Sequence, residues 1–125
     1  MILDTCALLW LVQESADLTD AVRKRIEGEP VVYVSAITGF EIGIKVQKGK
    51  LKLPARVADW FGLVLDHHDI KSLPLDLEAC IEATELPAIH ADPCDRLIIA
   101  TARRRRMPVV TADPVFRRYD IEVIF

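Results

Sequence analysis

The sequence opens with MILDTCALLW (residues 1–10), and this stretch decides the fold. Three apolar residues, Met1 to Leu3, lead directly into Asp4, and a helix-forming pattern begins immediately after that acid. A short, uninterrupted apolar run is typical of a strand that is covered on both faces, as in a parallel sheet. In such sheets ligands bind beyond the carboxyl ends of the strands, so Asp4 is expected at a ligand-binding edge.

Further strands and helices are predicted to alternate along the rest of the chain. β-rich runs lie at Val31–Val34, Ile70–Leu75 (the weakest), Val109–Thr111 and Ile121–Phe125. From capping residues, glycines and prolines we predict helices at Leu18–Glu27, after Ser35 as far as Gln47, at Ala55–His67 and from Pro93 to Arg106. Alternating strands and helices imply parallel pairing with right-handed crossovers. We therefore expect an α/β fold, a three-layer α/β/α sandwich around a central, mostly parallel sheet.

The size and composition of the chain fit a single domain over residues 1–125. The chain is 51% hydrophobic and 28% charged, an ordinary balance for a soluble globular protein. No apolar run approaches the roughly 18 residues that cross a bilayer, and no signal-peptide pattern is present. Three cysteines without a CxxC spacing indicate neither a disulfide framework nor a zinc site. We expect no membrane association and a cytoplasmic location.

Two candidate functional acids follow predicted strands. Asp4 follows the first strand, and Asp113 lies two residues beyond the strand at Val109–Thr111, so both are predicted at the same edge of the sheet. Each has a purely structural alternative. Asp4 could cap the helix that follows it, and Asp113 could open a turn with Pro114.

Two further candidate acids lie on predicted helices. Glu41 shares the apolar stripe of its helix, where a carboxylate is costly unless it pairs with Lys45 or binds a metal. Asp92 and Asp95 form a capping-box pattern at the start of another helix, with Asp92 as the cap. Asp95 is one turn further in, beside the apolar run Leu97–Ile99, and Arg96 is expected to tether this turn.

The four acids Asp4, Glu41, Asp95 and Asp113 together point to a metal site. Carboxylates gathered without a cation raise one another's pKa and destabilise the fold. Mg²⁺ or Mn²⁺ removes this difficulty, because both ions prefer oxygen ligands. A metal-bound water is also a better nucleophile at neutral pH, and the ion neutralises charge on a phosphate. The residues therefore predict metal-assisted phosphodiester hydrolysis.

Four sequence blocks, in this order and spacing, resemble the PIN-domain ribonucleases, and specifically the VapC-type toxins of bacterial toxin–antitoxin pairs. The blocks are ILDT (2–5), VSAITGFEIGIKVQKGKLKLP (34–54), HADPCDRLIIATA (90–102) and VVTADPVF (109–116). The resemblance implies that the four acids bind Mg²⁺ or Mn²⁺ and that Thr111 supports them by hydrogen bonding. It also implies endonucleolytic cleavage of RNA, inhibition by a cognate antitoxin protein, and a homodimer.

The sequence departs from this family at two places near the acids. Gly39 and Phe40 stand where relatives commonly have serine and tryptophan, and Cys94 replaces a bulky aromatic residue beside Asp95. Neither change removes a carboxylate, so we expect catalysis to be retained. We interpret Cys94 as a packing residue.

Basic residues follow the acids in both helical blocks. The run Arg103, Arg104, Arg105 and Arg106 is predicted to bind RNA phosphates, although a solvated helix end is an equally simple interpretation. A series of lysines likewise follows Glu41, at Lys45, Lys48, Lys50 and Lys52. The chain has no aromatic-rich RNA-binding stripe. The three histidines, His67, His68 and His90, are interpreted as surface or capping residues without a catalytic role.

The segment Val57–Leu65 carries more apolar residues than one helix face can bury, among them Trp60 and Phe61. Such a surplus marks either a partner interface or a helix enclosed within the core.

Two other functions remain open from the sequence. A phosphoacceptor signalling domain requires an acid pair after the first strand and a lysine after a late one, whereas Asp4 precedes Thr5 and VVTAD (109–113) has no lysine. A non-catalytic RNA-binding domain would not need all four acids.

Overall fold

The computed structural model describes all 125 residues and contains a five-stranded sheet in which every neighbouring pair is parallel. The strands are β1 (Ile2–Leu3), β2 (Val32–Ser35), β3 (Ile70–Leu73), β4 (Val109–Val110) and β5 (Val123–Ile124). Their order across the sheet is β3-β2-β1-β4-β5, which puts the first strand at the centre. All five predicted strands are confirmed, each within two residues at either end.

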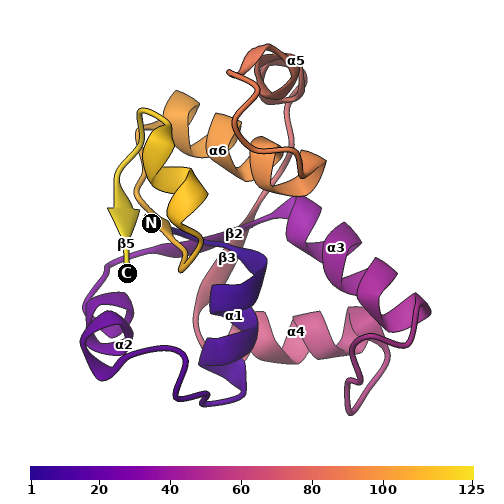
Figure 1. Cartoon of the computed structure of the whole chain (residues 1–125). Helices are drawn as coiled ribbons and strands as arrows, with labels where there is room; N and C mark the ends of the chain where they lie inside the picture. The colour runs from indigo at the N-terminus through magenta and orange to yellow at the C-terminus, as the bar shows by residue number, and fades with distance from the viewer.

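Helices cover both faces of the sheet. They are α1 (Thr5–Val12), α2 (Asp20–Glu27), α3 (Ala36–Gln47), α4 (Val57–His67), α5 (Leu77–Glu85), α6 (Pro93–Arg105) and the 3₁₀ helix η1 (Pro114–Arg118). In Figure 1, α5 and α6 lie on one side of the sheet, and α1, α2 and α4 lie on the other. The predicted three-layer sandwich is confirmed. None of these helices combines the length and apolar character needed to cross a lipid bilayer.

The central position of β1 in the sheet explains why its residues are all apolar. Ile2 and Leu3 are both fully buried, and they point to opposite faces. Leu3 belongs to the core beneath α1, α2 and α4, whereas Ile2 packs with Ile98 and Phe116 in the core beneath α6. Successive side chains of a strand alternate between faces, so only an all-apolar strand suits a sheet covered on both sides.

Two helix starts differ from the sequence-based expectations. α2 begins at Asp20 rather than at Leu18, and α4 begins at Val57, after the cap residue Arg56, rather than at Ala55. α5 was not predicted at all. Its cap is Asp76, which accepts a hydrogen bond from the Ala79 N–H at 2.8 Å, and its buried face is made of small alanines that give little hydrophobic periodicity.

The apolar surplus on α4 is mostly used inside the protein. Trp60 is only 5% exposed and its ring packs edge-on against Phe61, with ring centres 5.0 Å apart. Of the two interpretations of this segment, a helix enclosed within the core is therefore correct for Trp60, whose side chain is not available as a partner surface. Leu63, at 69% exposure, is the large apolar residue that α4 leaves in solvent.

Candidate functional site

Asp4 and Asp113 lie at the carboxyl ends of the neighbouring strands β1 and β4, which pair through Leu3 and Val110. The Asp4 N–H continues this pairing by donating to the Val110 carbonyl at 3.1 Å. The Asp4 side chain caps α1, because its Oδ1 accepts from the Ala7 N–H at 2.7 Å. Capping uses one carboxylate oxygen only, so the structural role of Asp4 and a role in a site are compatible.

Thr111 links these two acids. Its hydroxyl forms a hydrogen bond with the Asp4 carboxylate, and its Oγ1 accepts from the Asp113 N–H at 3.1 Å. The Asp113 Oδ1 accepts from the Val115 N–H at 2.9 Å, which caps η1. Each carboxylate is therefore oriented by a backbone N–H of the helical turn that follows it.

The start of α6 supplies Asp95. Asp92 is the cap of this helix, as predicted, and its Oδ1 accepts from the Cys94 N–H at 2.8 Å. The predicted reciprocal bond of a capping box is absent, because the Asp92 N–H donates to His90 Nδ1 at 3.1 Å instead. Asp95 is therefore free of capping and its carboxylate turns toward His90.

Glu41 reaches the site from α3. It forms no ion pair with Lys45, so the structural alternative for this acid is wrong. Instead, the Thr5 hydroxyl donates to Glu41 Oε1 at 2.5 Å, and Thr5 Oγ1 also lies 3.2 Å from the Thr38 hydroxyl. These contacts join α1 to α3 directly behind Asp4.

Burial and mutual repulsion raise the pKa of two of these acids. Burial is the largest cause for Asp4, with additional increases from the charges of Glu41 and Asp113, partly offset by the hydrogen bonds from Thr111 and Ala7. For Asp95, burial and then the charge of Asp92 raise the pKa to about 7. The cluster thus holds more negative charge than the surrounding protein neutralises, which is the condition that a bound cation relieves.

His90 lies between two of the acids, so its interpretation as a surface or capping residue was wrong. Its Nε2 is 2.9 Å from Asp113 Oδ2 and 3.0 Å from Asp95 Oδ2. The facing oxygens of these two carboxylates are close enough together to share a metal ion. Because Nδ1 accepts from the Asp92 N–H, the ring proton is at Nε2, where it donates to Asp113. The ring edge also packs against Phe116, with centres 5.7 Å apart.

Arg96 holds the loop that carries His90, as predicted for a tether. Its guanidinium donates to the His90 carbonyl at 3.1 Å and to the Leu86 carbonyl at 2.8 Å, and also to the carbonyls of Ala83 and Pro87. Tyr119 adds a second support, because its hydroxyl accepts from the His90 N–H at 2.8 Å. The rigid planar guanidinium suits several fixed carbonyls at once.

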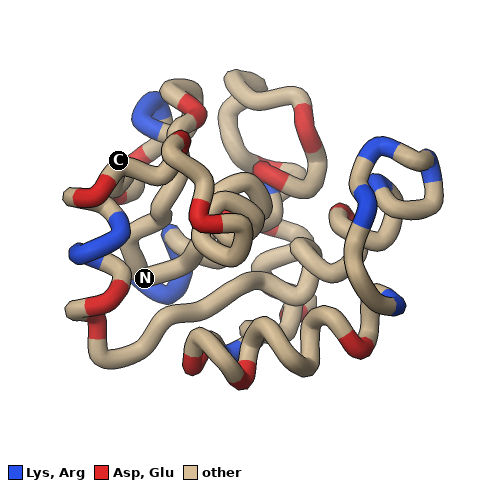
Figure 2. The backbone as a smooth tube through the Cα atoms, turned by 90° about the horizontal axis from the view of Figure 1, so that it is seen from below, with Lys and Arg blue, Asp and Glu red and all other residues tan.

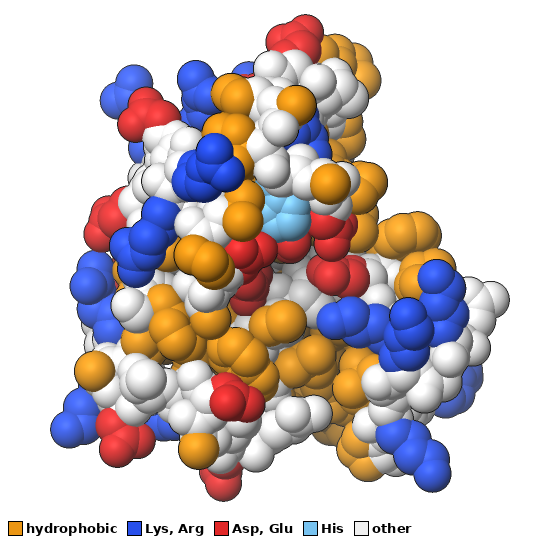
Figure 3. Space-filling model, in the orientation of Figure 1, with side chains coloured by type: hydrophobic (Ala, Val, Ile, Leu, Met, Phe, Trp, Pro, Cys, Tyr) orange, Lys and Arg blue, Asp and Glu red, His pale blue; other side chains and the backbone are white.

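The space-filling view shows how these groups are exposed. Red acidic side chains surround a pale blue histidine in a hollow at the centre of the face, with apolar side chains below and basic ones to the right (Figure 3). All four candidate acids offer oxygen donors, and a deprotonated thiol is absent, since burial and the nearby acids raise the pKa of Cys94 to about 11. The donor set fits a hard divalent cation.

The arginine run lies away from this hollow. Arg103 to Arg106 are at the opposite end of α6 from Asp95, and Arg103 and Arg104 each lie 3.6 Å from the Glu82 carboxylate. Their predicted contact with RNA remains a prediction.

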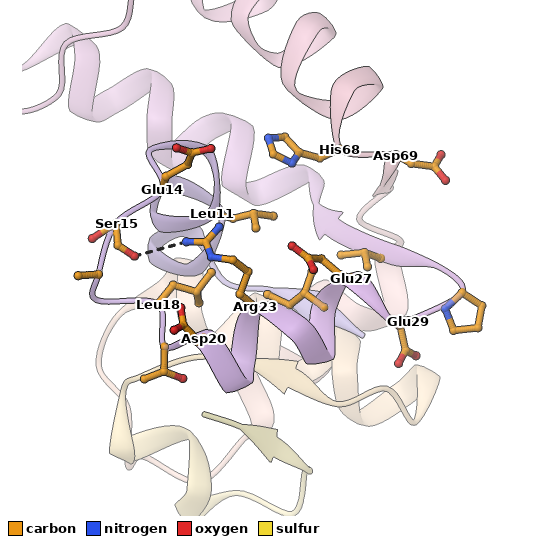
Figure 4. Close-up of a pocket in the computed structure, with 15 residues that line it drawn as sticks. Leu11, Glu14, Ser15, Leu18, Asp20, Arg23, Glu27, Glu29, His68 and Asp69 are labelled. Atoms are coloured by element: carbon orange, nitrogen blue, oxygen red, sulfur yellow. Dashed lines mark hydrogen bonds between the residues drawn. The ribbon is translucent and has the colours of Figure 1, made fainter.

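A separate cavity of about 770 Å³ opens at the other side of the molecule, beside α2 and the starts of β2 and β3. Figure 4 shows its acids spread around the walls, while Arg23 turns to the Ser15 carbonyl, to which it donates at 3.4 Å. Burial, followed by the charges of His67 and Arg23, lowers the pKa of His68 at its rim. The polar side chains of this cavity do not point toward one common position, unlike the acids at the carboxyl ends of β1 and β4.

Comparisons with known proteins agree with this geometry. Residues 1–122 match the PIN domain. Ribonuclease VapC22 of Mycobacterium tuberculosis is 28% identical over 120 residues, which cover 95% of this chain and 91% of that protein. Among solved structures, VapBC2 from Rickettsia felis bound to a promoter DNA fragment has a TM-score of 0.73 at 14% identity, covering 98% of this chain and 96% of that one. A toxin–antitoxin complex from Klebsiella pneumoniae has a TM-score of 0.71 at 17% identity, covering 99% and 95%. The chain belongs to the PIN domain family.

Proposed function

We propose that this protein is a Mg²⁺- or Mn²⁺-dependent endoribonuclease and the toxin of a toxin–antitoxin pair. The observation that carries the proposal is the gathering of Asp4, Asp95 and Asp113 at one sheet edge, where burial and repulsion raise the pKa of Asp4 and Asp95. The similarity to a protein named as a ribonuclease supports RNA as the substrate. The phosphoacceptor alternative is disfavoured, because Thr111 and Ala112, which follow β4, supply no lysine.

The four carboxylates would have two different roles in hydrolysis, metal binding and proton transfer. Asp4, Asp95 and Asp113 would hold the cation, which when bound activates water and neutralises charge on the phosphate. Glu41 is oriented by the Thr5 hydroxyl at Oε1, which leaves its second oxygen available to accept a proton from the attacking water. His90 fixes the separation of the Asp95 and Asp113 carboxylates through the contacts of its Nε2.

The toxin role rests on the relatives. VapC22 is named a ribonuclease, and the similar folds include complexes described as toxin–antitoxin pairs. We propose that this chain likewise has a cognate antitoxin protein and assembles as a homodimer. A positively charged antitoxin side chain would compete with the cation for the same carboxylates.

Removing the metal is expected to stop RNA cleavage. The purified protein should cut RNA in Mg²⁺ or Mn²⁺ and should be inactive in EDTA, with activity restored when the ion is added in excess. The measurement is the time course of cleavage of a labelled RNA on a denaturing gel, with the Asp4→Asn variant purified in parallel to exclude contaminating nuclease. Equal cleavage by the wild type in EDTA would rule out the metal mechanism.

Replacing His90 with Phe is expected to lower both metal affinity and cleavage by about 10- to 100-fold, the usual cost of losing a group that orients metal ligands. Phe retains the ring against Phe116 but cannot donate to Asp113. Affinity would be measured by calorimetric titration with Mn²⁺, and His67→Phe, on the exposed end of α4, is the control. Unchanged metal affinity in the His90 variant would show that the carboxylates do not need this support.

A further inference from the structure

We propose that a cleft beside the acid cluster binds one unpaired nucleotide of the RNA substrate, with its base packed on Phe40 and its phosphates paired with lysines. The cleft has a volume of about 190 Å³ and is lined by Phe40, Glu41, Ile44, Lys45, Lys48, Lys50 and Cys94. This inference rests on the proposed function and adds a substrate-binding site to it.

The apolar wall of the cleft is an aromatic residue left in solvent. Phe40 is 61% exposed, whereas Thr38 and Ile42 on the buried face of α3 are fully covered. Ile44 lies one turn further along the same face of the helix and extends the apolar surface. Cys94, at the start of α6, lines the same cleft. A planar base covering Phe40 would remove this surface from water.

The rim of the cleft is positively charged. Lys48 follows Ile44 by one helical turn, and Gly49 then adopts a φ of +72°, which reverses the chain. Because of this turn the Lys50 N–H donates to the Lys45 carbonyl at 2.8 Å, and the two lysines flank the same opening. Basic positions accordingly crowd the turn after α3 (Figure 2).

These lysines are available to a ligand. None of the ion pairs in the protein involves Lys45, Lys48 or Lys50. By contrast, Arg103 and Arg104 at the far end of α6 already lie beside Glu82. An apolar surface rimmed by unpaired cations favours single-stranded nucleic acid, whose bases stack on aromatic side chains while its phosphates attract lysine.

The cleft is continuous with the acid cluster. Glu41 directly follows Phe40 and lines the cleft, and Cys94 directly precedes Asp95. In Figure 3 the basic side chains lie immediately to the right of the red acids, over the end of α3. A nucleotide on Phe40 therefore has its phosphate next to the carboxylates. Only an unpaired base can expose its flat face for this contact, so the substrate is expected to be single-stranded at the cut.

The test is RNA affinity measured by fluorescence anisotropy with a short, unstructured, labelled RNA. All variants carry Asp4→Asn so that the RNA is not cut. Phe40→Ala is expected to weaken binding by about 5- to 150-fold, the range for losing one stacked base, and Phe40→Trp is expected to restore it. Leu63→Ala removes an equally exposed apolar side chain on α4 and should leave the affinity unchanged.

The lysines are tested by the salt dependence of the same affinity. Replacing Lys45, Lys48 and Lys50 with Gln is expected to lower the slope of log affinity against log salt by about 1.4, the value for losing contacts to the two phosphates that flank one nucleotide of a single strand. Lys71→Gln, at an exposed position on β3, is the control. A slope unchanged in the triple variant would overturn this part of the proposal.

Other occupants of the cleft give different results. If Phe40→Ala keeps its RNA affinity but loses a dimer seen by light scattering, or loses only antitoxin binding, the cleft is a protein interface and the proposal is wrong. If the wild type cuts RNA but Phe40→Ala has no effect on RNA affinity, the proposed nucleotide-binding cleft is wrong and the proposed ribonuclease function is kept. If the wild type neither binds nor cuts RNA, the proposed function itself fails.

Discussion

Replacing Asp95 with Asn is expected to lower RNA cleavage by at least ~100-fold, since even groups that only orient metal ligands cost 10–100-fold when lost. The same change is expected to raise the melting temperature of the metal-free protein. The side chain keeps its size, but it loses the charge that burial and Asp92 make unfavourable. Loss of activity combined with a gain in stability distinguishes a site acid from a structural one.

The gain in stability should depend on pH. In the metal-free folded protein the pKa of Asp95 is raised from 3.8 to about 7, so between these values the folded state binds more protons than the unfolded state. Stability from this group is therefore complete below pH 3.8 and is lost as the pH rises through 7. Because the carboxyl is partly exposed, solvent screening limits the effect to about 1–2 kcal/mol.

The measurement is thermal unfolding in EDTA at a series of pH values, together with cleavage assays in Mg²⁺. The wild type should lose stability toward neutral pH, and Asp95→Asn should lose less, so the two curves should separate as the pH rises. Asp76→Asn is the control, because Asp76 is the observed cap of α5, Asn is as good a cap as Asp, and the Asp76 charge is not among the causes that raise the pKa of Asp95. An Asp95→Asn protein that cleaves RNA at nearly the wild-type rate would remove Asp95 from the site.

The sheet and its acidic edge could be predicted because their signals are local. A short apolar run predicts β1. Because β1 is the central strand, both Ile2 and Leu3 are buried, and both must be apolar. Asp4 and Asp113 directly follow strands, and parallel strands end at the same edge. Nothing beyond neighbouring residues was needed to place these two acids.

His90 could not be predicted in the same way, because its position depends on distant contacts. Its loop is held by Arg96 from the following helix and by Tyr119, which is 29 residues away. A local signal was present in the spacing of His90 before the cap Asp92, whose N–H it accepts, but that signal also fits a simple capping role. Only the folded chain shows that Nε2 faces Asp95 and Asp113.

The burial of Trp60 could not be predicted from the sequence for a related reason. Counting apolar residues on α4 shows a surplus, but the count cannot say which neighbours cover them. In the structure the core beneath the sheet takes Trp60 and Val64, with Phe61 packed against it, and leaves Leu63 in solvent. Tertiary packing, rather than the helix pattern, decides which face is covered.

Expression of the wild-type chain alone in a bacterial host is expected to stop growth, and expression of Asp4→Asn is expected to permit it. The expected difference is large, because one enzyme molecule destroys many RNA molecules. Asp4 is suited to this test, since it is only 6% exposed and Asn can retain the hydrogen bond from the Ala7 N–H. The measurement is colony formation after induction, with Asp92→Asn as a variant that should remain toxic.

Co-expression of the cognate antitoxin protein is expected to restore growth of the wild type. The acid cluster is the reason, because its surplus negative charge attracts a basic side chain of an inhibitor as well as it attracts a divalent cation. Rescue by competition at the carboxylates predicts that the purified complex binds Mn²⁺ more weakly than the free protein does. If the wild type is harmless at high expression, the toxin role must be abandoned. If the complex binds Mn²⁺ as tightly as the free protein, the inhibitor acts by blocking the substrate and leaves the carboxylates open to the metal.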